Sequence, residues 1–299
     1  MRLAGSIPAL VTPFQRSGAL DLVAFRALLD WHLVEGSSGV VVAGSTGESG
    51  ALDESEVAAL LSVAVERLKG RVPIIVGAGG SATSQALLLA RIAAQVGADA
   101  ILATTPHYSR PTQAGLLAHY RALAKASPLP LILYNVPGRT GVDLLPQTVA
   151  QLADLPAVIA IKEAVPEESR MRELLQLRSS SFAILSGDDP TALRALTAGA
   201  DGVISVIANL APRAFAQMCQ KAAESQLQAA GSINAMLVPL YAAAALEPNP
   251  IPVKAGLSMM GRIEEVLRLP LLPLSAEYRA SVRAALAACE VPIAVELAA

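Results

Sequence analysis

One lysine in this sequence stands where its amine could do chemistry that few other side chains can do. Lys162 directly follows a short apolar run over residues 158–161. If that run is a buried strand, the amine at its end is partly desolvated, which lowers its pKa and leaves a neutral amine able to attack a ketone. The alternative is a solvated lysine that only begins the following loop. Position alone leaves both interpretations open.

Two other apolar runs lead into polar groups that would complement such an amine. Tyr134 closes the preceding run, and its phenol could relay protons, although an aromatic that fills a core is the ordinary interpretation. A turn before a predicted helix offers the hydroxyls of Ser45 and Thr46 with backbone N–H groups, which suits a carboxylate but is also a common turn. Arg139 could hold a second carboxylate through two hydrogen bonds, or could be a surface arginine. Together these groups favour a reactive amine.

The elements that must position these groups form a regular alternation. Short apolar runs bounded by Gly, Pro, Ser or Asp recur at residues 7–11, 40–43, 73–76, 100–103, 131–134, 158–161, 183–185 and 202–206. Such runs are typical of parallel strands that are buried on both faces. Amphipathic helices are predicted between them, for example over residues 22–34, 54–69 and 85–96.

Helix ends are also marked in the sequence. Asp53 followed by Glu56 predicts a capping box at a helix start. Gly97 and Gly199 each precede Ala-Asp at the start of a run, which indicates a left-handed helix end. We therefore predict an α/β fold, a (β/α)8 TIM barrel over residues 1–226, whose active site lies at the carboxyl ends of the strands.

From residue 227 onward the pattern is helical only, and we predict a C-terminal helical appendage over residues 227–299. The stretch 225–246 carries no charged residue and is long enough to span a membrane. It also contains polar residues and a proline that are costly in lipid, namely Gln226, Gln228, Ser232, Asn234 and Pro239. A buried helix is therefore predicted, and no contact with a membrane.

Composition narrows the functional classes. The 299 residues carry a formal net charge of −2, which gives no electrostatic reason to expect binding to nucleic acid or to anionic membranes. Hydrophobic residues make up 53% and aromatics 3%, so Ala, Leu and Val must supply the core. Cys219 and Cys289 have no metal or redox spacing and are interpreted as small buried residues in a reducing compartment. With no signal-peptide pattern at the start, a cytoplasmic location is expected.

Several other sites are excluded by their spacing. Residues 77–82 fit a dinucleotide-binding glycine pattern after a strand, but the acidic partner at the end of the next strand is missing. His32, His107 and His119 show no ligand spacing and no clustered carboxylates, so no metal site is predicted. A phosphate-binding Walker loop and a Gly-x-Ser-x-Gly nucleophile turn are also missing.

The order of the polar segments that follow the predicted strands resembles that of the dihydrodipicolinate synthase family, within the N-acetylneuraminate lyase group of class I aldolases. The resemblance covers about residues 7–273 and rests on segments 44–49, 105–115, 134–140, 161–163, 186–189, 202–206 and 248–254. It implies that Lys162 forms an imine with pyruvate. It also implies a proton relay of Tyr134, Thr46 and Tyr108, the last reaching in from a neighbouring subunit. The family usually has threonine where this chain has Ser45, which keeps a hydroxyl.

The resemblance further implies how the substrates are held. Thr46 and the backbone around Ile204 would bind pyruvate, Gly187 would line the pocket, and Arg139 would bind the carboxylate of L-aspartate 4-semialdehyde. The expected product is 4-hydroxy-tetrahydrodipicolinate, a precursor in diaminopimelate and lysine biosynthesis. No metal or organic cofactor is expected, and a homotetramer, a dimer of dimers, is implied.

Three alternatives remain at this point. Another class I aldolase of the group would act on a sugar-derived 2-keto acid, but sialic acid lyases generally lack an arginine at the place of Arg139. A non-catalytic barrel that binds keto acids is disfavoured because Lys162, Tyr134 and Thr46 occur together. A metal-dependent barrel enzyme is the third.

The chain also departs from relatives that are inhibited by L-lysine. Glu54 and Val57 stand where some sensitive enzymes have histidines, and His107 stands where they have tyrosine. Ser81 and Gln85 replace Asn and Glu. Weak or absent inhibition by lysine is therefore predicted.

Overall fold

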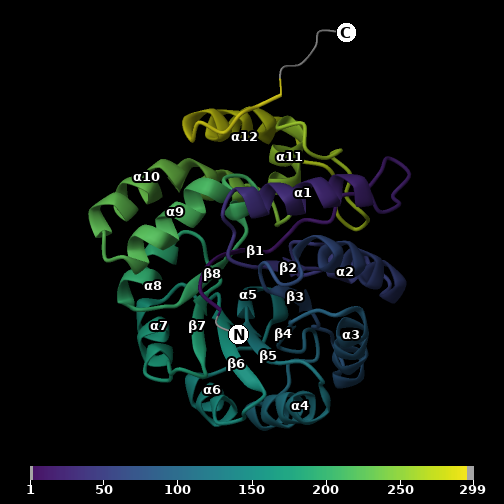
Figure 1. Ribbon diagram of the computed structural model, residues 1–299, viewed down its shortest axis with the longest axis vertical. Helices are drawn as coiled ribbons and strands as arrows, with labels where there is room; N and C mark the ends of the chain where they lie inside the picture. Colours follow the sequence, from purple (N-terminus) through teal and green to yellow (C-terminus); the bar gives the residue numbers. More distant parts are fainter. Residues whose placement is uncertain (1–2, 295–299) are drawn as a thin grey trace.

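Eight parallel strands form a ring that is surrounded by helices (Figure 1). The computed structural model describes residues 3–294. Hydrogen bonds join the strands in the order β1-β8-β7-β6-β5-β4-β3-β2, and a bridge between Ala9 and Val41 joins the two ends. The strands are β1 (Gly5–Pro8), β2 (Val40–Val42), β3 (Ile74–Gly77), β4 (Ala100–Thr104), β5 (Leu131–Asn135), β6 (Val158–Glu163), β7 (Ala183–Ser186) and β8 (Gly202–Ser205). The predicted (β/α)8 barrel is confirmed. The first strand starts two residues before the predicted run, and β3 is shifted by one residue from the predicted run 73–76.

The helices with predicted ends match them closely, except that the helix predicted over residues 85–96 begins two residues earlier. They are α1 (Leu22–Val34), α2 (Glu54–Leu68), α3 (Thr83–Val96), α4 (Gln113–Ala126), α5 (Pro137–Thr140), α6 (Pro146–Ala153), α7 (Glu168–Leu175), α8 (Ala192–Ala198), α9 (Pro212–Ala223), α10 (Leu227–Ala244), α11 (Ile251–Met259) and α12 (Ala276–Ala288). The Asp53 side chain accepts from the Glu56 N–H, and the Glu56 side chain accepts from the Asp53 N–H, which confirms the capping box. Gly97 and Gly199 end α3 and α8 with φ of 105° and 112°.

Successive strand residues point into two different cores. Tyr134, Ala160 and Ile204 belong to the core inside the barrel, whereas Ile161 belongs to the core between the strands and the helices. Because side chains alternate along a strand, Lys162 shares the inner face with Ala160, two residues before it. The amine therefore enters the barrel at the carboxyl end of β6.

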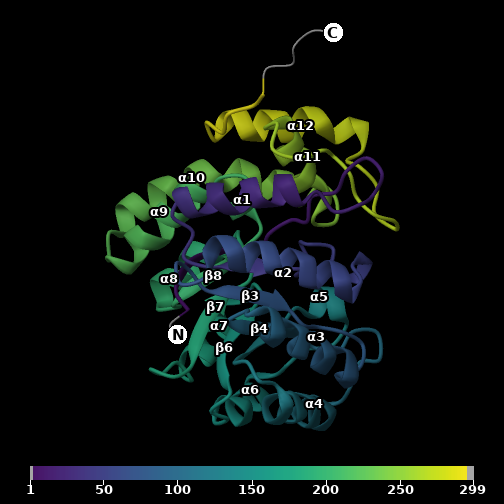
Figure 2. The same ribbon diagram turned by 45° about the vertical axis from the view of Figure 1, so that its right-hand side comes forward.

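The C-terminal helices share a core with one side of the barrel. Both views show α10, α11 and α12 outside α1 and α9 (Figures 1 and 2). One apolar cluster joins Leu28 of α1 and Val203 of β8 to Leu240 of α10 and Val282 of α12. These helices therefore pack as a continuation of the barrel core.

Helix α10 is less buried than the sequence predicted. Leu227–Ala244 has a mean hydropathy of 1.2 and is long and apolar enough to cross a membrane by length and composition, but only 28% of it is buried. Leu237, Leu240 and Tyr241 pack inward, while Val238 is 50% exposed. The prediction of a buried helix was thus only partly right. One face of α10 packs against the neighbouring helices and the other is open.

Candidate active site at the barrel mouth

Lys162 and Tyr134 lie side by side inside the mouth of the barrel. The parallel register pairs Tyr134 of β5 with Lys162 of β6. The Lys162 Nζ lies 4.1 Å from the centre of the Tyr134 ring, and the two residues are only 4% and 6% exposed. Within residues 3–294, Lys162 forms no ion pair and no side-chain hydrogen bond. The strand ladder thus delivers a buried, unengaged amine next to a phenol.

The next strand leaves room for the lysine side chain. Gly187 directly follows β7, and a Cβ built on it would lie 2.7 Å from Cε of Lys162. Any side chain at this position would push against the lysine, so glycine is required by close approach. Ile204 of β8 lies across the same interior, with no exposed surface. Gly187 and Ile204 therefore both line the space that Lys162 enters.

A buried carboxylate fixes the backbone that follows β8. Asp189 Oδ2 accepts hydrogen bonds from the N–H groups of Val206 (2.9 Å) and Ile207 (2.8 Å). Burial raises the pKa of this carboxyl, and these hydrogen bonds oppose the change. Asp189 thus ties the loop after β7 to the turn Ile207–Asn209. The sequence placed Asp189 in a polar string after β7 but gave it no role.

The loop after β2 presents two free backbone donors. Gly47 N–H and Glu48 N–H bond to carbonyl oxygens within the turn, whereas the N–H groups of Ser45 and Thr46 donate to no atom of residues 3–294. Ala43 and Glu48, at either end of this loop, have left-handed backbone with φ of 52° and 55°. Two adjacent free N–H groups are suited to bind a carboxylate.

The predicted helix does not follow this loop directly. Helix α2 begins at Glu54, as predicted, after a short 3-10 turn over Ser49–Ala51. The loop itself supplies the free amides of Ser45 and Thr46.

Asn249 links Thr46 to Arg139, a role that the sequence analysis missed. Its Nδ2 donates to Thr46 Oγ1 at 3.0 Å, and its backbone carbonyl accepts from Arg139 Nη2 at 3.1 Å. Because Thr46 Oγ1 accepts this bond, its own hydroxyl proton is available for another acceptor. Arg139 itself lies in the short helix α5 and is exposed. Thr46, Asn249 and Arg139 therefore form one side of the mouth.

A second polar cluster lies behind β5 and β6, outside the barrel. Glu163 accepts from Asn135 Nδ2 (3.1 Å to each oxygen) and from Arg170 Nη1 (3.3 Å). Arg170 also pairs with Asp143 at 2.6 Å, and Asn135 Oδ1 accepts from the Leu144 N–H. Burial raises the pKa of Glu163 to about 7, against the opposing effect of these donors. The cluster anchors both ends of the segment that carries α5.

Tyr108 is not brought to the other predicted site residues. It follows β4 in a loop, has a left-handed φ of 69°, and is 93% exposed. A tyrosine with almost no contact in its own chain can serve the site only if another subunit receives it. The single chain therefore leaves this prediction open.

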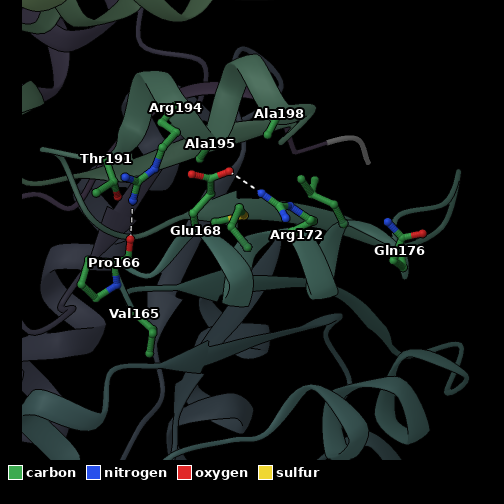
Figure 3. Close-up of a pocket in the computed structure, with 11 residues that line it drawn as sticks. Val165, Pro166, Glu168, Arg172, Gln176, Thr191, Arg194, Ala195 and Ala198 are labelled. Atoms are coloured by element: carbon green, nitrogen blue, oxygen red, sulfur yellow. Dashed lines mark hydrogen bonds and ion pairs between the residues drawn. The ribbon is translucent and has the colours of Figure 1, made fainter.

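A separate pocket of about 250 Å³ lies outside the barrel between α7 and α8 (Figure 3). Its rim includes Arg194, which donates to the Pro166 carbonyl, and the ion pair of Arg172 with Glu168 (2.5 Å). None of the predicted site residues lines it. Across residues 3–294, no cluster of three or more His, Cys, Asp or Glu side chains could hold a metal ion. Cys219 and Cys289 are free and buried, as predicted.

Known proteins resemble this chain over nearly its whole length. The model of the dihydrodipicolinate synthetase family matches residues 2–289. A 4-hydroxy-tetrahydrodipicolinate synthase of Stenotrophomonas maltophilia is 52% identical over 94% of this chain and 94% of its own length. The synthase of Herminiimonas arsenicoxydans is 47% identical over 95% and 97%.

A solved structure extends the comparison to three dimensions. The dihydrodipicolinate synthase of Acinetobacter baumannii, crystallised in complex with pyruvate, superposes with a TM-score of 0.95 at 41% identity. The match covers 97% of this chain and 100% of that one. The chain therefore belongs to the dihydrodipicolinate synthetase family.

Proposed function

We propose that this chain is a 4-hydroxy-tetrahydrodipicolinate synthase, which joins pyruvate to L-aspartate 4-semialdehyde through a Schiff base on Lys162. The observation that carries the assignment of Lys162 is its buried amine, free of any ion pair in the described chain and 4.1 Å from the Tyr134 ring centre. No ion pair or hydrogen bond within residues 3–294 occupies Nζ, which leaves it able to attack the keto carbon of a bound 2-keto acid.

The reaction follows from that attack. Nζ adds to C2 of pyruvate, water leaves, and the resulting imine draws electrons from C3 so that one C3 proton can depart. The enamine adds to the aldehyde carbon of the second substrate. The amino group of that substrate then replaces Lys162 at C2, which closes the ring and frees the lysine. Tyr134 and Thr46 carry the protons in this scheme, with Tyr108 as the third member.

The carboxylates are assigned to the two polar sides of the mouth. The free N–H groups of Ser45 and Thr46 hold the pyruvate carboxylate, together with the backbone near Ile204. Gly187 keeps that space open. Arg139 binds the carboxylate of the aldehyde substrate, and the Asn249 carbonyl orients its guanidinium.

Assembly is required for the complete relay. The 93% exposed side chain of Tyr108 fits a role in a neighbouring subunit, and we infer a homotetramer built as a dimer of dimers. Sedimentation of the purified chain measures this directly. A stable monomer with full activity would contradict the role of Tyr108.

The reaction needs no metal or organic cofactor, because the imine itself is the electron sink. A cytoplasmic location is part of the proposal, and it is supported by the two free, buried cysteines, which suit a reducing compartment. Activity that persists after dialysis against a chelator is the expected result.

Turnover tests the substrate assignment. The purified chain is incubated with pyruvate and L-aspartate 4-semialdehyde, and separately with N-acetylneuraminate, and products are followed by mass spectrometry. We expect the cyclic product in the first incubation and no cleavage in the second. Cleavage of the sugar acid without condensation would reassign the enzyme within its group.

A further inference from the structure

A fully buried ion pair joins the C-terminal helices to the loop after β2. Lys254 in α11 and Glu48 have 0% and 1% side-chain exposure, and Lys254 Nζ lies 2.6 Å from Glu48 Oε1. The same Nζ donates to the Thr12 carbonyl at 2.8 Å and lies 4.4 Å from the centre of the Phe14 ring. The two charged residues are 206 positions apart in the sequence.

Glu48 is held from its other side as well. Its Oε2 accepts the backbone N–H of Arg268 at 3.0 Å. The Arg268 guanidinium donates to the Ala51 carbonyl (2.7 Å) and pairs with Glu56 (2.5 Å), so it also fixes the chain that follows Glu48. Thr12 Oγ1 adds a hydrogen bond of 2.7 Å to the Gly47 carbonyl. We call Glu48, Lys254, Thr12 and Arg268 the loop clamp.

The loop needs such restraint because its backbone is unfavourable. Both Ala43 and Glu48 adopt left-handed φ, which is costly for residues other than glycine and persists only where surroundings enforce it. Between them lie Ser45 and Thr46, whose N–H groups are unpaired in residues 3–294. A buried charge pair is a poor source of stability compared with apolar packing, so its presence here calls for another reason.

We propose that Glu48 and Lys254 are positioning residues that hold the amides of Ser45 and Thr46 in the geometry that binds the pyruvate carboxylate. The C-terminal helices thereby complete the pyruvate pocket. This inference rests on the proposed function for the identity of the ligand, but the restraint on the loop is independent of it.

The test uses the double variant Glu48→Gln with Lys254→Met, which removes both charges and leaves an amide oxygen to accept from Arg268. The matched control is Glu35→Gln with Arg213→Met, a pair at 2.7 Å between α1 and α9, away from the mouth. We expect the double variant to melt near the wild-type temperature, since replacing both partners leaves no unpaired charge. We expect its KM for pyruvate to rise about 10-fold. This is smaller than the roughly 100-fold loss of rate that a displacement of about 1 Å can cause. The KM for the aldehyde stays the same.

The split between the two KM values distinguishes positioning from general damage. Unchanged KM for pyruvate in a folded double variant would overturn the proposal, as would an equal rise for both substrates. If the double variant does not fold, Thr12→Val removes only the hydroxyl bond to Gly47. A smaller rise in the pyruvate KM is then expected, and no rise would count against the clamp.

Amide hydrogen exchange separates this inference from the proposed function. The peptide covering residues 43–49 should exchange faster in the double variant or in Thr12→Val, and at the wild-type rate in the control pair. A wild-type chain that does not react with pyruvate would refute the proposed function alone. Unchanged exchange in that peptide would refute the clamp alone.

Discussion

The two sides of the barrel mouth are held in place by different means. On one side, Lys162 and Tyr134 are set by the hydrogen-bonded register of β5 and β6, strands that follow each other in the chain. On the other side, Ser45 and Thr46 lie in an irregular loop that is contacted by Asn249, which precedes α11, and by Lys254 of α11. The groups proposed to react thus lie on strands, and the amides proposed to bind a carboxylate depend on long-range tertiary contacts.

This difference shows where each part of the site is vulnerable. Side chains on a strand ladder are positioned by backbone hydrogen bonds that do not depend on the side chains themselves. A loop held by a few buried charged contacts loses its geometry when one of them is removed.

The largest effect is expected on the strand side, in catalysis alone. Tyr134→Phe keeps the ring against Lys162 and removes only the phenol oxygen. Loss of a positioned proton carrier should lower kcat by roughly 10²- to 10⁴-fold. Steady-state rates and thermal melting are measured together. A large drop in the melting temperature of Tyr134→Phe would show that the strand side does not keep its structure independently of this side chain.

A single substitution on the loop side should instead lower the free energy of unfolding. Lys254→Met leaves the Glu48 carboxylate buried without its cation, which should cost about 3–5 kcal/mol of unfolding free energy. Arg213→Met breaks an ion pair whose arginine is 66% exposed and should cost less than about 1 kcal/mol. Urea unfolding of both variants measures the difference. Similar losses would mean that the buried pair contributes no more than a surface one.

The cluster behind the strands predicts a pH effect. Burial raises the pKa of Glu163 to about 7 from an ordinary 4.5, so the folded chain holds this proton more tightly than the unfolded chain. The stability from this group is complete below about pH 4.5 and is lost as the pH rises to about 7, by roughly 3 kcal/mol.

Comparison with Glu163→Gln isolates that effect. The difference in unfolding free energy between wild type and variant should shift in favour of the variant as the pH rises through this window. Unfolding curves at several pH values between about 4.5 and 7 measure it. A difference that does not change with pH would show that Glu163 is charged throughout, held so by Arg170 and Asn135.

The smallest effect is expected from added L-lysine, which should inhibit the enzyme weakly or not at all. Glu54 and Val57 supply no imidazole, and Gln85 supplies no charge to pair with the lysine ammonium. We expect apparent Kd values weaker than about 1 mM, or less than roughly 4 kcal/mol of binding. Initial rates in a coupled assay with added lysine measure this. Strong inhibition at micromolar lysine would contradict it.

The strand side was largely predictable from sequence, for local reasons. Apolar runs and capping residues define each βα unit, and the position of Lys162 after its run placed it at the mouth. The loop side was not predictable in the same way. Glu48 and Lys254 were given no role beyond the segments 44–49 and 248–254, because their pairing across 206 positions leaves no local pattern. Asn249 was missed for the same reason, and the half-open face of α10 reflects packing that composition does not encode.

The most direct test of the account is reductive trapping. The purified chain is treated with pyruvate and borohydride, digested, and analysed by mass spectrometry, with Lys162→Ala as the control. The account predicts a pyruvate-derived mass on the peptide that contains Lys162, and no adduct in the variant. An adduct on a different lysine, or no adduct in the folded wild-type chain, would contradict it.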